Sequence, residues 1–247
     1  MLEPAVEYLR RFAQLASRQE FARNLIGELG PGVEIWTRSA NMPDAPVIFL
    51  STGIHGDERC GPEALLQFLS GWTFAPDIEW VLAPLLNPSG FGQGTRCNAE
   101  GIDLNRDFLR CRCSETQAFK EWWRRRTRAC ELHLSLHEDW EAEGFYLYEI
   151  DTSEQGTSLS AAILSRVEEV APLQRTGPVD GHLLAAPGLI VHEPVADEPE
   201  GWPEAIWLTR TWPMASYTLE APGQLAPEVR VRSLVAGLEG ALRGYQR

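Results

Sequence analysis

The feature that most constrains the fold is the alternation of short apolar runs with segments of helical periodicity. Val47–Leu50 and Trp80–Leu86 are apolar on both faces, which is typical of strands buried at the centre of a sheet. Between them a helix is expected from Pro62 to Leu69, with proline in an allowed position of the first turn. Because such alternation indicates a sheet covered on both faces, we expect an α/β fold. Its form would be a three-layer α/β/α sandwich with a central mixed, mostly parallel sheet.

The remaining elements are predicted from the same periodicities. Helices are expected over residues 6–16, 20–29, 115–129, 159–170 and 227–245, and strands over 33–38, 132–136 and 215–219. Residues 172–213 are rich in proline, glycine and acidic side chains, so we expect long loops with short strands there. No internal repeat or interdomain linker stands out, and residues 1–247 are therefore expected to form a single domain.

The chain is strongly acidic. Its 22 Lys and Arg residues against 35 Asp and Glu residues give a formal net charge of −13. Such a surface repels phosphate backbones, so no nucleic acid partner is expected. No apolar run reaches the roughly 18 residues of a membrane span, and the N-terminus lacks the pattern of a signal peptide. With five cysteines, an odd number, we expect reduced thiols, a cytoplasmic location and no membrane contact. The sequence carries no signal for an oligomeric state.

A candidate metal-binding motif follows the first buried run. His55 and Glu58 stand three positions apart, and Gly53 and Gly56 bracket the histidine, which lets the backbone turn both side chains toward one ion. Catalytic zinc commonly takes three protein ligands of the His and Glu type and keeps a fourth position open for water. Alone the motif is weak, because a surface histidine before a helix would look the same.

The third ligand can be sought among the remaining histidines. His133 and His137 lie on or beside a strand, where four residues span about 13 Å, too far for both to hold one ion. His137 is the better candidate because it ends the strand, and α/β sheets place their sites at the C-terminal ends of strands. We expect His133 to be a core or helix-facing residue, and His182 and His192 to be solvated loop histidines.

A second block of the sequence concentrates anion-binding side chains. Residues 87–108 contain two arginines, Arg96 and Arg106, and two amides close to them. Arginine presents a planar fork that matches a carboxylate, so this density suits an anionic group. A loop in which Arg106 simply pairs with Asp103 or Asp107 would explain the same residues without a ligand.

Together these pieces carry a family resemblance. The order of the motifs is that of zinc metallocarboxypeptidases: His55-x-x-Glu58, Asn87-Pro-x-Gly-Phe91, Thr95-Arg96, Asp103-Leu104-Asn105-Arg106, the strand-end His137, and Thr218-Leu219-Glu220. It spans roughly residues 47–223. The chain is most similar to short single-domain bacterial members such as murein-peptide amidases. The related aspartoacylase and succinylglutamate desuccinylase group shares much of the central block.

The resemblance implies one zinc ion per chain, held by His55, Glu58 and His137, with the whole of residues 1–247 as the catalytic domain. It further implies that Asp103 accepts a hydrogen bond from the free ring N–H of His55, an arrangement that fixes the orientation of a metal ligand.

The same resemblance implies the catalytic and substrate-binding roles. Arg96 would stabilise the oxyanion, and Asn105 and Arg106 would grip the free carboxylate of the substrate. Glu220 would be the general base. If Glu220 had no such role, it would be an unpaired buried carboxylate, and burying such a group costs folding free energy.

Two features depart from the family pattern. Digestive members place a tyrosine in the loop before the general base, but residues 179–212 contain none, so Tyr146, Tyr148 or a histidine could take its role. The run from Glu138 to Glu143 places four carboxylates beside the expected metal site. It either contributes to the cleft or is a solvated face.

The expected function is therefore hydrolysis of an amide bond next to a free carboxylate by a zinc metallocarboxypeptidase, with a small peptide or amino-acid amide as substrate. The stretch Thr218–Pro222 resembles peptidase versions of the catalytic strand, which favours this reading. An N-acyl amino acid deacylase with the same metal chemistry is the alternative enzyme. A non-catalytic peptide-binding relative is disfavoured because every ligand-type residue, the base and both arginines are present.

Overall fold

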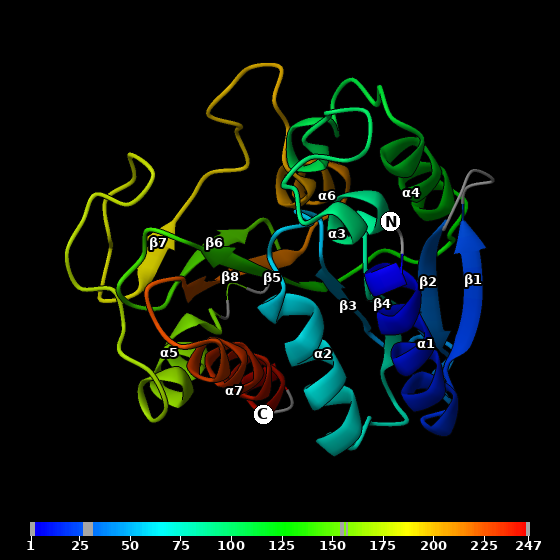
Figure 1. Ribbon diagram of the computed structural model, residues 1–247. Helices are drawn as coiled ribbons and strands as arrows, with labels where there is room; N and C mark the ends of the chain where they lie inside the picture. The colour runs from blue at the N-terminus through cyan, green and yellow to red at the C-terminus, as the bar shows by residue number, and fades with distance from the viewer. Residues whose placement is uncertain (1–2, 27–31, 154–155, 157, 246–247) are drawn as a thin grey trace.

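An eight-stranded mixed sheet forms the middle of the computed structural model, which describes residues 3–26, 32–153, 156 and 158–245 (Figure 1). The strand order is β1-β2-β4-β3-β5-β8-β6-β7. The strands are β1 (Ala22–Ile26), β2 (Val33–Arg38), β3 (Val47–Thr52), β4 (Glu79–Ala83), β5 (Leu132–Asp139), β6 (Tyr146–Asp151), β7 (Leu189–Val191) and β8 (Ala215–Pro222). The four central strands, β4, β3, β5 and β8, all run parallel, whereas β2 and β6 join them antiparallel.

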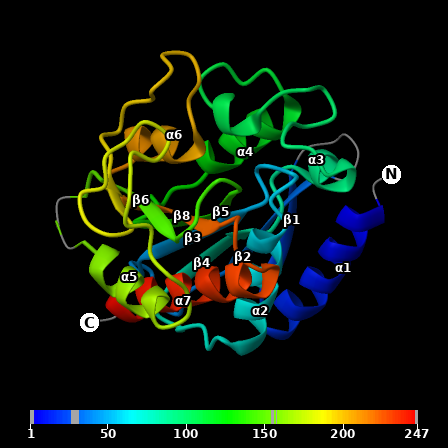
Figure 2. The same cartoon turned by 60° about the vertical axis from the view of Figure 1, so that its left-hand side comes forward.

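Helices cover both faces of this sheet (Figures 1 and 2). They are α1 (Glu3–Arg18), α2 (Cys60–Gly71), α3 (Pro88–Gln93), α4 (Ser114–Arg124), α5 (Ser160–Glu168), α6 (Glu204–Thr211) and α7 (Pro227–Tyr245), with a 3-10 turn η1 (Leu104–Arg106). One apolar core joins α1, α2, α5 and α7 to the sheet, and a second joins α4 and α6 to the opposite face. The predicted α/β/α sandwich with a mixed, mostly parallel sheet is confirmed.

The central strands are buried because both of their faces are covered. All six residues of β3 are buried, as are the first six of β5. Removing apolar surface from water stabilises such a sheet by roughly 25 cal/mol per Å². This explains why the apolar runs predict the central strands well, since a strand between two helical layers has no polar face to show.

One predicted element is wrong and one prediction is incomplete. The segment 20–29 was expected to be helical, but Ala22–Ile26 pairs antiparallel with β2 as the edge strand β1, and residues 27–29 lie outside the described residues. A short helix is marginal without packing, whereas this segment gains a ladder of backbone hydrogen bonds along β2. Residues 172–213 were expected to hold only loops and short strands, and the short strand β7 is present. They also contain helix α6.

Helix α6 depends on a partner that is distant in sequence. Its first residue, Glu204, donates its backbone N–H to Oδ1 of Asn105 over 2.9 Å, 99 positions away. The first N–H groups of a helix have no partner inside the helix, so this amide serves as a cap. Strand β6 was not predicted, and α4 ends at Arg124, earlier than expected. None of the described helices combines the length and apolar character that a membrane crossing requires.

Candidate active site

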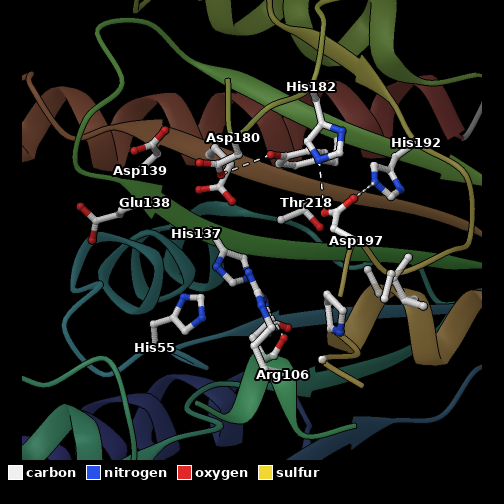
Figure 3. A pocket seen from close by; sticks show the side chains of 18 of the residues that line it. His55, Arg106, His137, Glu138, Asp139, Asp180, His182, His192, Asp197 and Thr218 are labelled. Atoms are coloured by element: carbon white, nitrogen blue, oxygen red, sulfur yellow. Dashed lines mark hydrogen bonds and ion pairs between the residues drawn. The ribbon is translucent and has the colours of Figure 1, made fainter. Parts of the chain in front are cut away.

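The parallel strands β3, β5 and β8 end at the same edge of the sheet, and the candidate residues meet there. His55 and Glu58 lie in the turn after β3, His137 lies near the end of β5, and Glu220 is directly opposite His137 on β8. A cavity of about 460 Å³ opens at this edge and is lined by all four side chains. Figure 3 shows His55 and His137 in its wall. Such a cavity at strand C-termini is the usual place for a site in an α/β sheet.

The turn that brings His55 and Glu58 together requires its two glycines. Gly53 has a φ of +63°, a conformation that side chains with a Cβ rarely adopt. Gly56 packs so closely on α3 that a Cβ would lie 2.0 Å from the carbonyl carbon of Gly90. The backbone therefore fixes the direction of both side chains.

Three donor groups converge on one point. Nδ1 of His55 lies 2.5 Å from Oε1 of Glu58, and Nδ1 of His137 lies 3.1 Å from Oε2 of the same carboxylate. All three residues are buried. Two imidazole nitrogens and a carboxylate in this arrangement match the donor set of catalytic zinc sites, so the residues fit a metal ion.

The electrostatics of the cluster favour a cation. Burial opposes ionisation of Glu58, but the imidazoles of His137 and His55 hold its pKa well below the ordinary value. Burial likewise works against protonated His55, yet the Glu58 and Asp103 carboxylates raise the pKa of its imidazole above the usual value. Positive charge between these groups is therefore stabilised even though the residues are buried.

Asp103 lies beside the imidazole ring of His55. Its Oδ1 is 3.5 Å from Nε2 of His55, and its Oδ2 accepts a hydrogen bond of 2.9 Å from Nε of Arg96. Burial opposes its ionisation, but His55, Arg96 and Arg106 keep the pKa of Asp103 well below the usual value. Nε2 of His55 is buried and has no other partner among the described residues, so Asp103 is the group that can orient this ring.

Glu220 lies close to the other charged side chains of this cavity. Burial raises the pKa of its carboxyl to about 8, with further contributions from the charges of Glu58, Asp139 and Asp180. His137 acts in the opposite direction. A carboxyl whose pKa is raised toward neutrality, in a cavity and next to a metal-type cluster, is a typical functional group.

The three anion-binding candidates also line the cavity. A terminal nitrogen of Arg96 lies 3.3 Å from Nδ1 of His55, which directs this guanidinium at the metal cluster. Arg106 donates to the backbone oxygen of Asn105 over 2.9 Å. Asp103 pairs with Arg96, and Asp107 pairs with Arg112. Neither acid forms an ion pair with Arg106 in the described part of the chain, so the loop-pairing alternative for Arg106 is wrong.

The acidic run after His137 divides between internal contacts and the cavity. Glu138 is tied to Arg230 by a contact of 2.6 Å and to the backbone N–H of Cys60. Asp139 accepts a hydrogen bond of 3.0 Å from Tyr146. Both acids line the cavity together with Glu141, whereas Glu143 is exposed. The run is therefore part of the cleft rather than only a solvated face.

Comparison with known proteins decides the family. The chain matches the catalytic domain of succinylglutamate desuccinylase/aspartoacylase over residues 44–182, more than half of its length. The chain belongs to this family. Carboxypeptidase SOL1 of Arabidopsis thaliana is 29% identical in a match that covers 53% of this chain and 32% of that protein. The chain thus spans about a third of the length of this curated relative.

Solved structures of metallopeptidases share the fold. A candidate metallopeptidase from Shewanella baltica OS155 matches with a TM-score of 0.83 at 24% identity, over 96% of this chain and 90% of that one. A metallo-carboxypeptidase from Burkholderia cenocepacia matches with a TM-score of 0.69 at 17% identity, over 96% and 69%. The predicted resemblance to metallocarboxypeptidases and to the desuccinylase/aspartoacylase group is confirmed.

The other histidines of the chain fall into two groups. His133 is fully buried between the hydroxyls of Ser51 and Ser216, at 3.0 and 2.9 Å, as expected for a core residue. His182 and His192 lie in loops, as expected, but they are only partly solvated. Both line the cavity, with ring centroids 4.8 Å apart. The apolar run Leu189–Val191, which forms the short strand β7, is a local signal that could have placed His192 at a strand end.

The role of the family's loop tyrosine has several candidates in the cavity. Tyr146 and Tyr148 both line it, and Tyr146 lies opposite Glu220 in the pairing of β6 with β8. The hydroxyl of Tyr148 donates to Asp180 over 3.4 Å. Burial raises the pKa of both phenols above the usual value, so both act as neutral hydrogen-bond donors.

Proposed function

We propose that this chain is a zinc-dependent hydrolase that cleaves a peptide or amide bond next to a free carboxylate, a metallocarboxypeptidase activity carried by residues 1–247 as one domain. The observation that supports it best is the arrangement of donors and base. The cluster of His55, Glu58 and His137 stands directly beside Glu220, and two arginines line the same cavity. A site for metal, base and anion in one cavity is what amide hydrolysis requires.

The metal would be held by His55, Glu58 and His137, with Asp103 orienting His55. When bound, zinc supplies Lewis acidity, which activates water and polarises the scissile carbonyl.

Glu220 would act as general base and then as general acid. A carboxyl with a pKa near 8 lies close to the working range in which a group can both accept a proton from water and return it to the leaving amine. Its place opposite His137 in the pairing of β5 with β8 supports this role, because it puts the carboxyl on the same part of the sheet edge as a metal donor.

Each arginine would bind a different negatively charged group during the reaction. Arg96 reaches the metal cluster, so it would stabilise the developing oxyanion. Arg106 is free of carboxylate partners among the described residues and would bind the substrate carboxylate with a two-pronged contact. Asn105 uses its carbonyl oxygen to cap α6, which leaves its amide N–H groups as the donors for the same carboxylate.

A second activity, hydrolysis of N-acyl amino acids, is supported by the family match over residues 44–182. Both activities use the same metal, base and arginines and differ in the acyl group. The deciding experiment measures the zinc content of the purified protein and its turnover of dipeptides against N-acetyl and N-succinyl amino acids. We expect faster turnover of dipeptides. Faster turnover of acyl amino acids would establish the deacylase, and zinc-loaded protein inert toward both classes would indicate a peptide-binding relative.

A further inference from the structure

A second group of two histidines and one carboxylate stands in the wall of the same cavity, away from the first cluster (Figure 3). Nε2 of His182 lies 3.3 Å from Oδ2 of Asp197, and Nε2 of His192 lies 3.4 Å from Oδ1 of Asp197. Each oxygen of one carboxylate therefore faces one imidazole nitrogen. None of the three residues has a role in the function proposed above.

The hydrogen bond made by Nδ1 of His192 determines which groups its other ring nitrogen, Nε2, can bind. Nδ1 of His192 lies 2.6 Å from the backbone oxygen of Glu193. A carbonyl oxygen only accepts, so Nδ1 carries the proton of the neutral ring. Nε2 of the neutral ring then directs a lone pair at the Asp197 carboxylate, so either a further proton or a metal ion must lie between the two. A ring N–H bound to a backbone carbonyl is also the usual support of a histidine that binds metal.

The spacing of the donors suits a metal ion. For tetrahedral zinc with bonds of about 2.0–2.1 Å, the ligand atoms are separated by about 3.3–3.4 Å. Each imidazole nitrogen lies at about this distance, 3.3 and 3.4 Å, from its own oxygen of Asp197, and one donor atom of each of the three residues lies within 4.8 Å of the others. They are longer than a charge-assisted hydrogen bond, for which about 2.7–2.9 Å is usual.

The backbone holds both imidazoles in place. Val179 and His182 exchange two backbone hydrogen bonds across a tight turn whose central residues, Asp180 and Gly181, both have positive φ, 48° and 81°. This is the geometry of a two-residue hairpin turn, which leaves little freedom to His182. His192 follows β7 directly and extends its pairing with β6 through a hydrogen bond of 2.9 Å to the oxygen of Glu149.

The surroundings favour a cation as well. Asp180 and Glu198 line the cavity near the cluster and add negative charge. The ring of Tyr148 packs edge-on against both imidazoles, with centroids 5.7 and 6.2 Å away. The side chains of His182 and His192 are only 23% and 15% exposed, so solvent competes weakly for their nitrogens.

We propose that His182, His192 and Asp197 form a second site for a divalent ion of the zinc class, which ties the loop wall of the cavity to the β6–β7 edge. Three protein ligands leave at least one coordination position for water or for an oxygen of a bound molecule. The occupied site would hold residues 179–197 in the conformation that closes this side of the cavity.

The test counts zinc ions on the full chain. Metal-stripped protein is dialysed against Zn²⁺ buffered by a competing chelator, and bound zinc is measured by mass spectrometry. We expect two ions per chain for the wild type. His192→Ala and Asp197→Asn should each bind one, because each breaks the loop site alone. Asp180→Asn is the matched control, since it removes a carboxylate from the same turn without touching the donor set, and it should keep both ions.

The outcomes separate this site from the active site. His55→Ala should also bind one ion, and the double variant His55→Ala/His192→Ala none. One ion in the wild type, or two ions retained by Asp197→Asn, would overturn the second site and leave the proposed function intact. Two ions retained by His55→Ala would instead contradict the proposed function. Circular dichroism of each variant verifies folding, and Asp197→Asn is a near-isosteric change of a 68% exposed side chain.

Discussion

Two clusters in one cavity have the same composition, two histidines and one carboxylate, but they are built differently. His55, Glu58 and His137 are buried and stand at the ends of two central strands. His182, His192 and Asp197 stand on the loop wall, and the side chain of Asp197 is 68% exposed. The difference lies in how strongly the charges within each cluster act on one another. Charge buried at a sheet edge is strongly coupled to its neighbours, while charge on a loop is screened by water.

The coupling is visible in the protonation behaviour of the buried cluster. The pKa of Glu58 lies well below its ordinary value because two imidazoles face it, although burial opposes this, and the pKa of Glu220 next to it is raised to about 8 by burial. The pKa values of two carboxyl groups at one site are thus driven apart, which is the pattern expected if one holds a cation and the other moves a proton. The loop cluster has Asp180 and Glu198 nearby and, in our proposal, acts through its bound ion.

The largest effect is expected from the metal ligands of the buried cluster. His137→Ala should lose the buried-site ion and reduce turnover to background, because three ligands are the minimum of a catalytic zinc site. His133→Ala is the matched control, since His133 lies four residues earlier on β5 and its two ring nitrogens contact the hydroxyls of Ser51 and Ser216. It should keep the ion and lose roughly 1–3 kcal/mol of unfolding free energy through unsatisfied buried groups. Metal analysis and thermal unfolding measure both, and loss of the ion in His133→Ala alone would reverse the assignment.

The next prediction tests the role of Glu220 as general base independently of metal binding. Glu220→Gln should keep the zinc content and the fold, because the amide has the shape of the acid, yet lower kcat by roughly 10²–10⁴-fold through loss of the proton acceptor. Steady-state kinetics together with zinc analysis would show this. Asp197→Asn, the same change at the loop cluster, should leave kcat much closer to wild type. Turnover of Glu220→Gln at half the wild-type rate would exclude Glu220 from the mechanism.

A smaller effect concerns the arginine without a carboxylate partner. Arg106→Ala should raise KM for substrates with a free α-carboxylate by about ten- to a hundredfold, which corresponds to roughly 1.5–3 kcal/mol for a charge-assisted contact. Amidated analogues of the same substrates should be affected far less. Equal effects on both substrate types would show that Arg106 acts by supporting the loop rather than by binding the carboxylate.

The smallest effect is a preference for positively charged substrates. Asp139, Glu141, Asp180 and Asp197 line the cavity, whereas Glu138 is paired with Arg230. Their combined field should favour a lysine-bearing peptide over a glutamate-bearing one by a few-fold in kcat/KM. The preference should shrink at 1 M salt, where the screening length is about 3 Å, and also when zinc occupies the loop cluster. A preference for the glutamate peptide, or one that salt does not change, would contradict this reading.

The central sheet and the buried cluster could be predicted because their signals are local. Val47–Leu50 and Trp80–Leu86 are apolar on both faces, and His55 and Glu58 share one glycine-bracketed turn. The edge strand β1 and helix α6 could not, because both depend on partners elsewhere in the chain. β1 forms along β2, and α6 is capped by Asn105. Local periodicity carries no information about such partners.

The sequence by itself determined the sheet's layers, the order of the motifs and the family, since burial of apolar runs and a few fixed spacings suffice for these. Only the tertiary structure decided which side chains share a space. It brought His182 and His192 to Asp197, freed Arg106 from carboxylate partners among the described residues, and paired Glu138 with Arg230. The physical reason is that charge and coordination depend on distances across strands and loops, and these are set by packing of the whole chain rather than by neighbours in sequence.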